Sequence, residues 1–179
     1  MLSDKDMRRR MAKGWINGKI HGTICGLGST MENTEKVRQW LPEMCRKYNI
    51  RSVNDAGAGD LHWIKHIDWD VDYRPFDLFP RKPEVKYLDI TTEDMPPADA
   101  VLCRHVLNHL VNGEDRERVE MALQRFTVQH IFLFATNFIP RPGKREFVRL
   151  RLDEWLGPPL ESCEDSHEYG CTLDLWRLS

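Results

Sequence analysis

Acidic residues flank two glycines in the segment 53–60, which reads VNDAGAGD. A short apolar approach that ends in an acid and a glycine-rich turn is how an α/β sheet presents its backbone to a nucleotide-like ligand, because glycine alone lets the backbone come close. Asp77 follows about twenty residues past the glycines, the distance at which such folds keep a carboxylate for the ribose hydroxyls. The turn has two glycines where the dinucleotide fingerprint has three. The pattern therefore predicts an adenosyl site rather than a pyrophosphate site.

Three other predicted strands also end in a polar residue. Short apolar segments indicate four β-strands, which end at Asp55, Asp77, Asp89 and Cys103. The first, third and fourth of these span about 51–55, 85–89 and 99–103. In an open α/β sheet, ligands bind outside the carboxyl ends of the strands. We therefore expect these four side chains at one ligand-binding edge.

Two segments have the apolar spacing of amphipathic helices. Residues 30–48 follow a capping-box signal, Ser29 with Glu32 three positions later, and residues 114–127 place an apolar stripe on one face. Upstream, basic residues in 3–15 are interspersed with methionine and tryptophan, which predicts a short basic helix or a solvated terminus.

The last third of the chain completes the sheet. The near-continuous apolar segment 131–135 predicts a strand buried on both faces. Residues 147–152 and 171–178 are expected to pair as antiparallel strands, and the acidic stretch 161–168 is expected to be a loop. Together these elements predict an α/β, Rossmann-like fold: a doubly wound, mostly parallel sheet with helices on both faces and an antiparallel C-terminal strand pair, in a single domain. We expect that domain over 29–179, after a basic helix and loop over 1–28.

Composition narrows the classes of function. A formal net charge of −2 gives no global attraction to nucleic acid or to anionic membranes. The five cysteines form no Cys-x-x-Cys pair and their number is odd, which predicts free thiols in a reducing cytoplasm. No apolar run approaches the length of a membrane span.

The chain resembles a small group of bacterial and phage class I S-adenosylmethionine-dependent methyltransferases. The resemblance covers most of the chain and rests on residues 28–34, 55–63, 73–80, 98–110 and 173–178. It implies S-adenosylmethionine as cofactor. It also implies that the cofactor loop comprises Asp55, Ala56, Gly57, Gly59 and Asp60, that Asp77 with Leu78 takes the ribose, that Asp89 and Ile90 face the adenine, and that Cys103 and Arg104 lie with His105 beside the methionine part.

Side-chain chemistry agrees with part of this assignment. The two ribose hydroxyls are donors, and the carboxylate of Asp77 can accept both through charge-assisted hydrogen bonds. Asp89 could accept the adenine amine or could be a turn or N-cap carboxylate. Asp60 could bind the ammonium group of the ligand or cap the following helix.

His105, Asn108 and His109 are candidate catalytic residues near the transfer end of the pocket. A neutral imidazole could take a proton from the methyl acceptor, although both histidines are equally consistent with structural roles. Methyl transfer from a sulfonium depends mainly on alignment and can proceed without a dedicated base. The i, i+4 pairs His62/His66 and His105/His109 lack a clear third ligand, so we predict no metal site.

The sequence does not identify the acceptor. It has neither the Asn/Asp-Pro-Pro-aromatic motif of amino-methylating DNA enzymes after the fourth strand nor a Pro-Cys dipeptide for cytosine carbon-5 chemistry. We therefore expect a small-molecule or partner-presented acceptor and no nucleic-acid or membrane partner. The alternative is a protein that keeps the cofactor fold without catalysis, as a virion component or a partner subunit.

Overall fold

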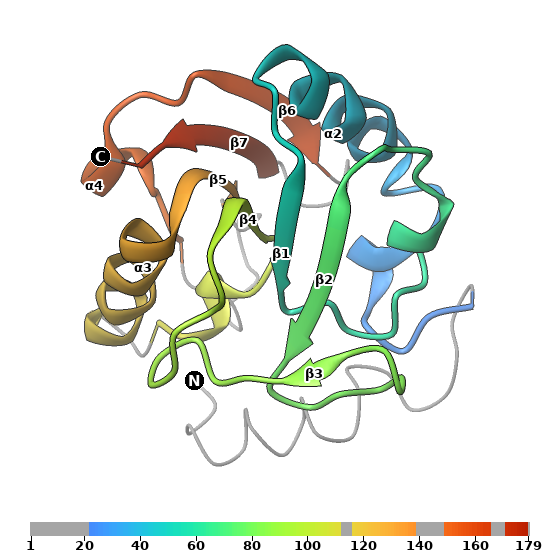
Figure 1. Cartoon of the computed structure of the whole chain (residues 1–179), viewed down its shortest axis with the longest axis horizontal. Coiled ribbons are helices and arrows are strands. Elements are labelled where there is room, and N and C mark those ends of the chain that lie inside the picture. Colours follow the sequence, from blue (N-terminus) through green and yellow to red (C-terminus); the bar gives the residue numbers. More distant parts are fainter. Residues whose placement is uncertain (1–21, 112–115, 139–148, 166–170, 179) are drawn as a thin grey trace.

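The computed structural model describes residues 22–111, 116–138, 149–165 and 171–178. Its central feature is one seven-stranded sheet in the order β3-β2-β1-β4-β5-β7-β6 (Figure 1). The strands are β1 (Ser52–Ala56), β2 (Asp72–Asp77), β3 (Lys86–Tyr87), β4 (Ala98–Cys103), β5 (His130–Asn137), β6 (Glu161–Asp165) and β7 (Cys171–Arg177). The order changes direction at β1, so the crevice expected to hold a ligand lies between β1 and β4.

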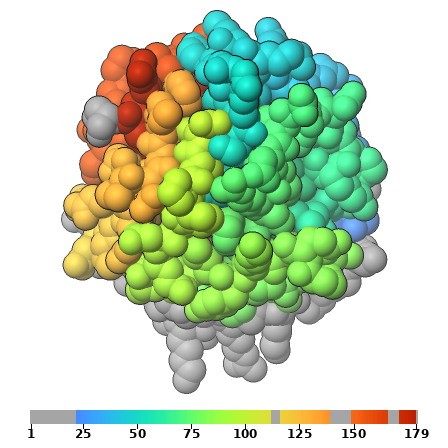
Figure 2. All heavy atoms as spheres, viewed as in Figure 1, coloured from blue at the N-terminus to red at the C-terminus, as the bar shows by residue number. Residues whose placement is uncertain are grey.

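The sheet is mostly parallel, as predicted. β1 pairs in parallel with both β2 and β4, and β4 pairs in parallel with β5. β7 runs antiparallel to β5 and to β6, which gives the expected antiparallel C-terminal pair. β3 and the chain that leads to β4 cross the lower part of the face seen in Figure 2.

The prediction for the partner of the last strand was wrong. Residues 161–165, expected in a loop, form β6 and pair with β7, whereas residue 150 makes only an isolated bridge to Phe138. β6 is an edge strand with alternating burial: Cys163 and Asp165 are buried, while Ser162 and Glu164 are exposed. Residues 147–148 lie outside the described residues.

Helices cover both faces of the sheet. α2 (Glu35–Lys47) and α3 (Glu117–Gln129) pack through their apolar stripes against opposite faces, and the short α4 (Asp153–Leu156) joins α3 on its face (Figure 1). From α2, the buried apolar residues are Val37, Leu41, Met44 and Cys45; from α3, they are Val119, Ala122, Leu123 and Phe126. The prediction that helices lie on both faces of the sheet is therefore confirmed.

The start of the first predicted helix was wrong by five positions. Helix α2 begins at Glu35, and residues 30–34 form turns held by Thr30, which accepts the Asn33 N–H at its hydroxyl and the Thr34 hydroxyl at its carbonyl. Ser29 belongs to a 3₁₀ turn (Leu27–Ser29) instead of capping a helix. The helix ends at Lys47, and two residues later the φ of 54° at Asn49 lets the Ile50 N–H reach the Cys45 carbonyl at 2.8 Å.

The first 21 residues, where the basic helix was predicted, lie outside the described residues. Within the described residues, no helix combines the length and the apolar character that a membrane crossing needs.

Candidate active site

The glycine turn follows β1 and is hydrogen-bonded to the carboxyl end of β2. The N–H groups of Gly57 and Ala58 donate to the Phe76 carbonyl at 2.9 and 3.0 Å. The carboxylate of Asp77 accepts the Gly59 N–H at 2.9 Å through one oxygen and the Phe79 N–H at 2.7 Å through the other. Asp77 therefore lies against the glycine turn, as the sequence predicted, and it also shapes that turn.

The turn requires glycine at two positions. Gly57 has a φ of 106°, and a Cβ there would lie 2.2 Å from Val106 Cγ2. Gly59 has a φ of 61°, and a Cβ there would lie 2.6 Å from Cys25 Sγ. Leu61 also has a positive φ, 58°, so a third residue of the turn adopts the left-handed conformation without being glycine. Only Gly57 and Gly59 could be recognised from the sequence, because Leu61 gives no glycine signal.

Asp55 is buried beneath this turn. The Tyr73 hydroxyl donates to its carboxylate at 2.5 Å. Burial raises the pKa of Asp55 to about 7; the hydrogen bond from Tyr73 opposes the rise, and the negative charge of Asp77 adds to it. Burial also raises the pKa of Asp77, against the N–H groups of Phe79 and Gly59. Two carboxyl groups therefore share a poorly solvated edge, an arrangement that favours a cation.

Asp60 holds the N-terminal segment on the glycine turn. Its carboxylate accepts the Ile24 N–H at 3.0 Å and the His62 N–H at 3.2 Å. Burial acts to raise the pKa of Asp60, but these N–H donors and the Thr23 hydroxyl outweigh it, and the pKa is lowered. The carboxylate has a local structural role, and its binding to a ligand ammonium group stays a prediction.

Asp89 also has local partners. It accepts the Thr91 hydroxyl at 2.6 Å and the Thr91 N–H at 3.0 Å, while Glu93 accepts the Asp89 N–H at 2.9 Å. This is the turn-carboxylate alternative that the sequence left open. The adenine contact of Asp89 and of the buried Ile90 stays a prediction.

The end of β4 carries a buried ion pair that the sequence did not predict. Arg104 donates to Asp165 of β6 at 2.6 Å and to the Gly28 carbonyl at 2.6 Å, and its guanidinium lies 5.1 Å from the centre of the Trp63 ring. The side chain of Arg104 thus joins β4, β6 and the N-terminal segment. Cys103, before it, is buried, which raises the pKa of its thiol.

His105 lies against the same aspartate. Its Nε2 is 3.1 Å from Asp165 Oδ2, and its backbone N–H donates to the Thr136 hydroxyl at 3.1 Å. Its φ of 55° is unusual for a histidine, and its ring packs edge-on to Phe138 at 6.0 Å. Burial acts to raise the pKa of Asp165, but the charges of Arg104 and His105 hold it well below its usual range. Asp165 is therefore an anion close to the imidazole, although Nε2 forms no well-aligned hydrogen bond to any described residue.

Asn108 and His109 follow in a 3₁₀ turn (Leu107–His109). Asn108 is buried, and its Oδ1 has no hydrogen-bond partner among the described residues. Burial, together with the nearby His105, lowers the pKa of His109 to about 3. His109 is therefore uncharged near neutral pH and a very weak base.

The described residues contain no group of three or more histidines, cysteines and acids placed to hold a metal ion. That the protein uses no metal stays a prediction.

Comparison with known proteins gives matches in structure and none in sequence. No protein-family model and no curated protein matches the chain. The N-methyltransferase NodS from Bradyrhizobium japonicum WM9, solved with S-adenosyl-L-homocysteine, is similar with a TM-score of 0.67 at 14% identity over 97% of each chain. Magnesium protoporphyrin IX methyltransferase (ChlM) from Synechocystis PCC 6803, solved with bound SAM, is similar with a TM-score of 0.60 at 15% identity over 98% of this chain and 91% of that one.

The chain has the class I methyltransferase fold. Within this fold, the structure gathers the predicted residues into two adjoining groups. Asp55, Gly57, Gly59 and Asp77 meet at the ends of β1 and β2. The second group follows β4 and lies beside the first, since a Cβ built on Gly57 would meet Val106 Cγ2 at 2.2 Å.

Three residues of these groups were missed from the sequence. Tyr73 could have been found from the alternation of side chains along β2, because it lies four residues before Asp77 and therefore on the same face of the strand. Asp165 was missed because residues 161–168 were predicted to form an acidic loop. Thr136, which accepts the His105 N–H, lies in an apolar strand with no local signal for that role.

Proposed function

We propose that this protein is an S-adenosylmethionine-dependent methyltransferase that acts on a small-molecule acceptor. The observation that carries the proposal is the bond between Asp77 and Gly59, because it sets a half-buried carboxylate against the glycine turn that follows β1, next to the switch point between β1 and β4. The fold match with methyltransferases supports the reaction class.

The residues at this edge fit the cofactor chemically. Each oxygen of Asp77 accepts one N–H, and a carboxylate oxygen has a second lone-pair direction that a ribose hydroxyl could use. The raised pKa of Asp55 shows that its ionised form lacks solvation, so a ligand cation nearby would stabilise it. Asn108 offers a buried oxygen with no partner among the described residues.

Bound cofactor would supply a methyl group on a positively charged sulfonium. The role of the chain is then to align an acceptor nucleophile with that methyl group and to exclude water. We assign proton removal from the acceptor to His105, because Asp165 lies 3.1 Å from its Nε2 and would stabilise the imidazolium that forms. The low pKa of His109 makes it a poor base at neutral pH, so we place it in the wall of the site.

The non-catalytic alternative gains no support from the comparisons. The odd number of cysteines and the lack of a Cys-x-x-Cys pair support the proposed reducing, cytoplasmic compartment.

Calorimetric titration with S-adenosylhomocysteine, followed by a labelled-methyl screen against small molecules and cell extract, tests the proposal. We expect micromolar binding and a labelled product. His105→Ala should then lower the transfer rate by about 10²–10⁴ while cofactor affinity changes little. Absence of both heat and thermal stabilisation at millimolar ligand would end the methyltransferase assignment; cofactor binding with no labelled product from any extract would favour the non-catalytic module.

A further inference from the structure

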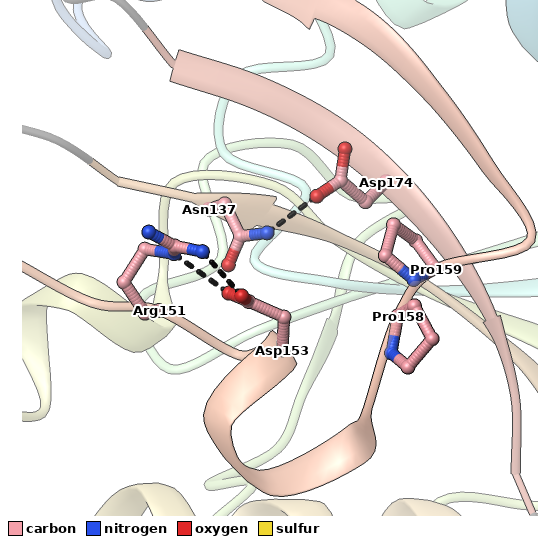
Figure 3. A pocket seen from close by; sticks show the side chains of 6 residues that line it. All are labelled: Asn137, Arg151, Asp153, Pro158, Pro159 and Asp174. Carbon is pink, nitrogen blue, oxygen red and sulfur yellow. Dashed lines mark hydrogen bonds and ion pairs between the residues drawn. The ribbon is translucent and has the colours of Figure 1, made fainter.

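The last two side chains of β5 point to opposite sides of the strand. Asn137 lines a cavity of about 430 Å³ beside α4, whose polar side chains are paired with one another (Figure 3). There Asn137 accepts the Leu152 N–H at 2.6 Å and donates to Asp174. Thr136, one residue earlier, points toward His105 beyond the end of β4. The strand end that carries Thr136 is therefore fixed by contacts on its other side.

The Thr136 hydroxyl connects the backbone of His105 to the carboxylate of Asp165. Its oxygen accepts the His105 N–H at 3.1 Å, and the hydroxyl donates to Asp165 Oδ2 at 3.5 Å. The same Oδ2 lies 3.1 Å from His105 Nε2. Thr136 is buried, and its branched Cβ restricts rotation about χ1. One hydroxyl thus contacts both the main chain of the histidine and the anion beside its imidazole.

His105 has a backbone conformation that needs such support. Its φ of 55° lies in the left-handed region, which residues other than glycine rarely adopt. Strained conformations of this kind persist where the surrounding contacts impose them, and they are concentrated at functional sites. The Thr136 hydroxyl is the acceptor for the N–H of this strained residue. It therefore stabilises the conformation that places the imidazole beside Asp165.

The imidazole of His105 has one enclosed edge. Its Nε2 is buried beside Asp165, and a Cβ built on Gly28 would lie 3.7 Å from both Cδ2 and Nε2. The side chain is nevertheless 19% exposed, so the exposed area belongs to its other atoms. Even without the alignment of a hydrogen bond, a proton on Nε2 is favoured, because a lone pair there would face a carboxylate oxygen. The lone pair of the neutral ring is then on Nδ1, at the opposite edge.

We propose that Thr136 is a positioning residue for proton removal: it holds His105 with Nε2–H toward Asp165, so that Nδ1 is the nitrogen that accepts the proton. The inference rests on the proposed methyltransferase function. The acceptor oxygen or nitrogen forms its bond to the methyl carbon as its proton moves to Nδ1, and the electron pair of the broken carbon–sulfur bond remains on the sulfur. The anionic Asp165 stabilises the imidazolium that results.

Long-range ¹H–¹⁵N NMR spectra of the histidine rings test this arrangement without cofactor or acceptor. At about pH 9, where a histidine is ordinarily neutral, we expect the His105 ring to be the Nε2–H tautomer. Thr136→Val, which keeps the shape and removes the hydroxyl, should give a mixture of both tautomers, whereas Thr136→Ser should retain the wild-type tautomer. A wild-type ring that is predominantly Nδ1–H would overturn the proposal, and this measurement needs no variant to fold.

The rate of methyl transfer gives a second readout. We expect Thr136→Val to lower kcat by about 10–100-fold, less than His105→Ala does, with unchanged affinity for S-adenosylhomocysteine and with most of the rate restored in Thr136→Ser. Thr127→Val is the control: it removes an exposed hydroxyl that donates to the Gln124 carbonyl at 2.7 Å, and it should match the wild type in both measurements.

A folded Thr136→Val protein with the wild-type tautomer and rate would overturn the proposal, because Thr136 would then have only a structural role. The ring spectra contain no cofactor, so their failure and that of the methyltransferase assignment are distinguishable.

Discussion

The carboxylate of Asp77 holds the backbone N–H of Gly59 at 2.9 Å across the ends of two adjacent strands. Its other oxygen accepts the N–H of Phe79. The residue that the sequence singles out for ribose binding therefore also fixes the turn on which the rest of the cofactor would lie. Recognition and local structure are coupled at this one side chain.

Asp77→Ala should consequently have two effects. Loss of two charge-assisted bonds to the ribose should weaken S-adenosylhomocysteine binding by about 2–4 kcal/mol, or about thirty-fold to nearly a thousand-fold. Loss of the acceptors for Gly59 and Phe79 should lower the free energy of unfolding by about 1–3 kcal/mol. Calorimetric titration measures the first effect and urea denaturation the second.

Asp72→Ala is the control, since Asp72 lies at the opposite end of the same strand in an exposed pair with Arg74. It should change both quantities by less than about 1 kcal/mol. A folded Asp77→Ala protein with wild-type affinity would show that Asp77 does not bind the cofactor.

Gly57→Ala should destabilise the protein through two separable causes. The new methyl group would meet Val106 Cγ2 at 2.2 Å, and the φ of 106° is strained for alanine. We expect a loss of about 2–5 kcal/mol in the free energy of unfolding. Adding Val106→Ala removes the clash and leaves the strain, so a double-mutant cycle should return a favourable coupling of about 1–3 kcal/mol.

Gly157→Ala separates the strain from the clash. Gly157 also has a positive φ, but a Cβ there would meet no heavy atom within 4 Å. It should cost only the strain, about 1–3 kcal/mol. A coupling near zero between positions 57 and 106 would show that the turn relaxes away from β4, and that the two groups of the site are not joined through Val106.

The sheet and its ligand edge were predictable because local patterns determine them. Parallel strands buried on both faces need continuous apolar segments, and the carboxyl ends of those strands must meet at one edge. Asp77 and Cys103 end their strands as predicted, and Asp55 lies one residue before the end of β1. The third strand was predicted too long: β3 ends at Tyr87, and Asp89 lies in the turn that follows.

The features that were not predicted depend on contacts between residues distant in sequence. Leu61 adopts the left-handed conformation without the glycine that would signal it. Asp165 lies 61 residues from Arg104 in sequence, in a strand whose acidic composition resembles a loop. No local pattern reports that an edge strand carries one inward-facing aspartate, so both the buried ion pair and the orientation of His105 escaped prediction.

Substitutions that break the Arg104–Asp165 pair should lower the free energy of unfolding more than most others. Asp165→Asn would leave the Arg104 charge buried without its partner and should lower the free energy of unfolding by about 3–5 kcal/mol. Arg104→Met combined with Asp165→Asn should recover part of this loss. Glu164→Gln, next to it on β6, removes the exposed pair with Lys36 and should cost only about 0–1 kcal/mol. Chemical denaturation of the four proteins checks this, and equal costs at 164 and 165 would contradict a buried ion pair.

The pKa of Asp55, about 7, predicts a pH-dependent stability of a definite sign. In the unfolded chain an aspartate has a pKa of about 4, so between about pH 4 and 7 the folded state binds more protons. The free energy of unfolding contributed by this group must then fall as pH rises through that window and level off above it.

Asp55→Asn cannot ionise, while its amide oxygen can still accept from Tyr73. We expect it to match the wild type near pH 4.5 and to be more stable by roughly 2–4 kcal/mol at pH 8. Taking the difference between the two proteins cancels most contributions of other titrating groups. The same ionisation should make S-adenosylmethionine binding release a proton near pH 6.5 in the wild type and not in the variant, which titration in buffers of different ionisation enthalpy measures. A stability difference that is constant from pH 4.5 to 8 would mean that Asp55 is already ionised at the lower pH, and the cation would then have to be recognised by another group at this edge.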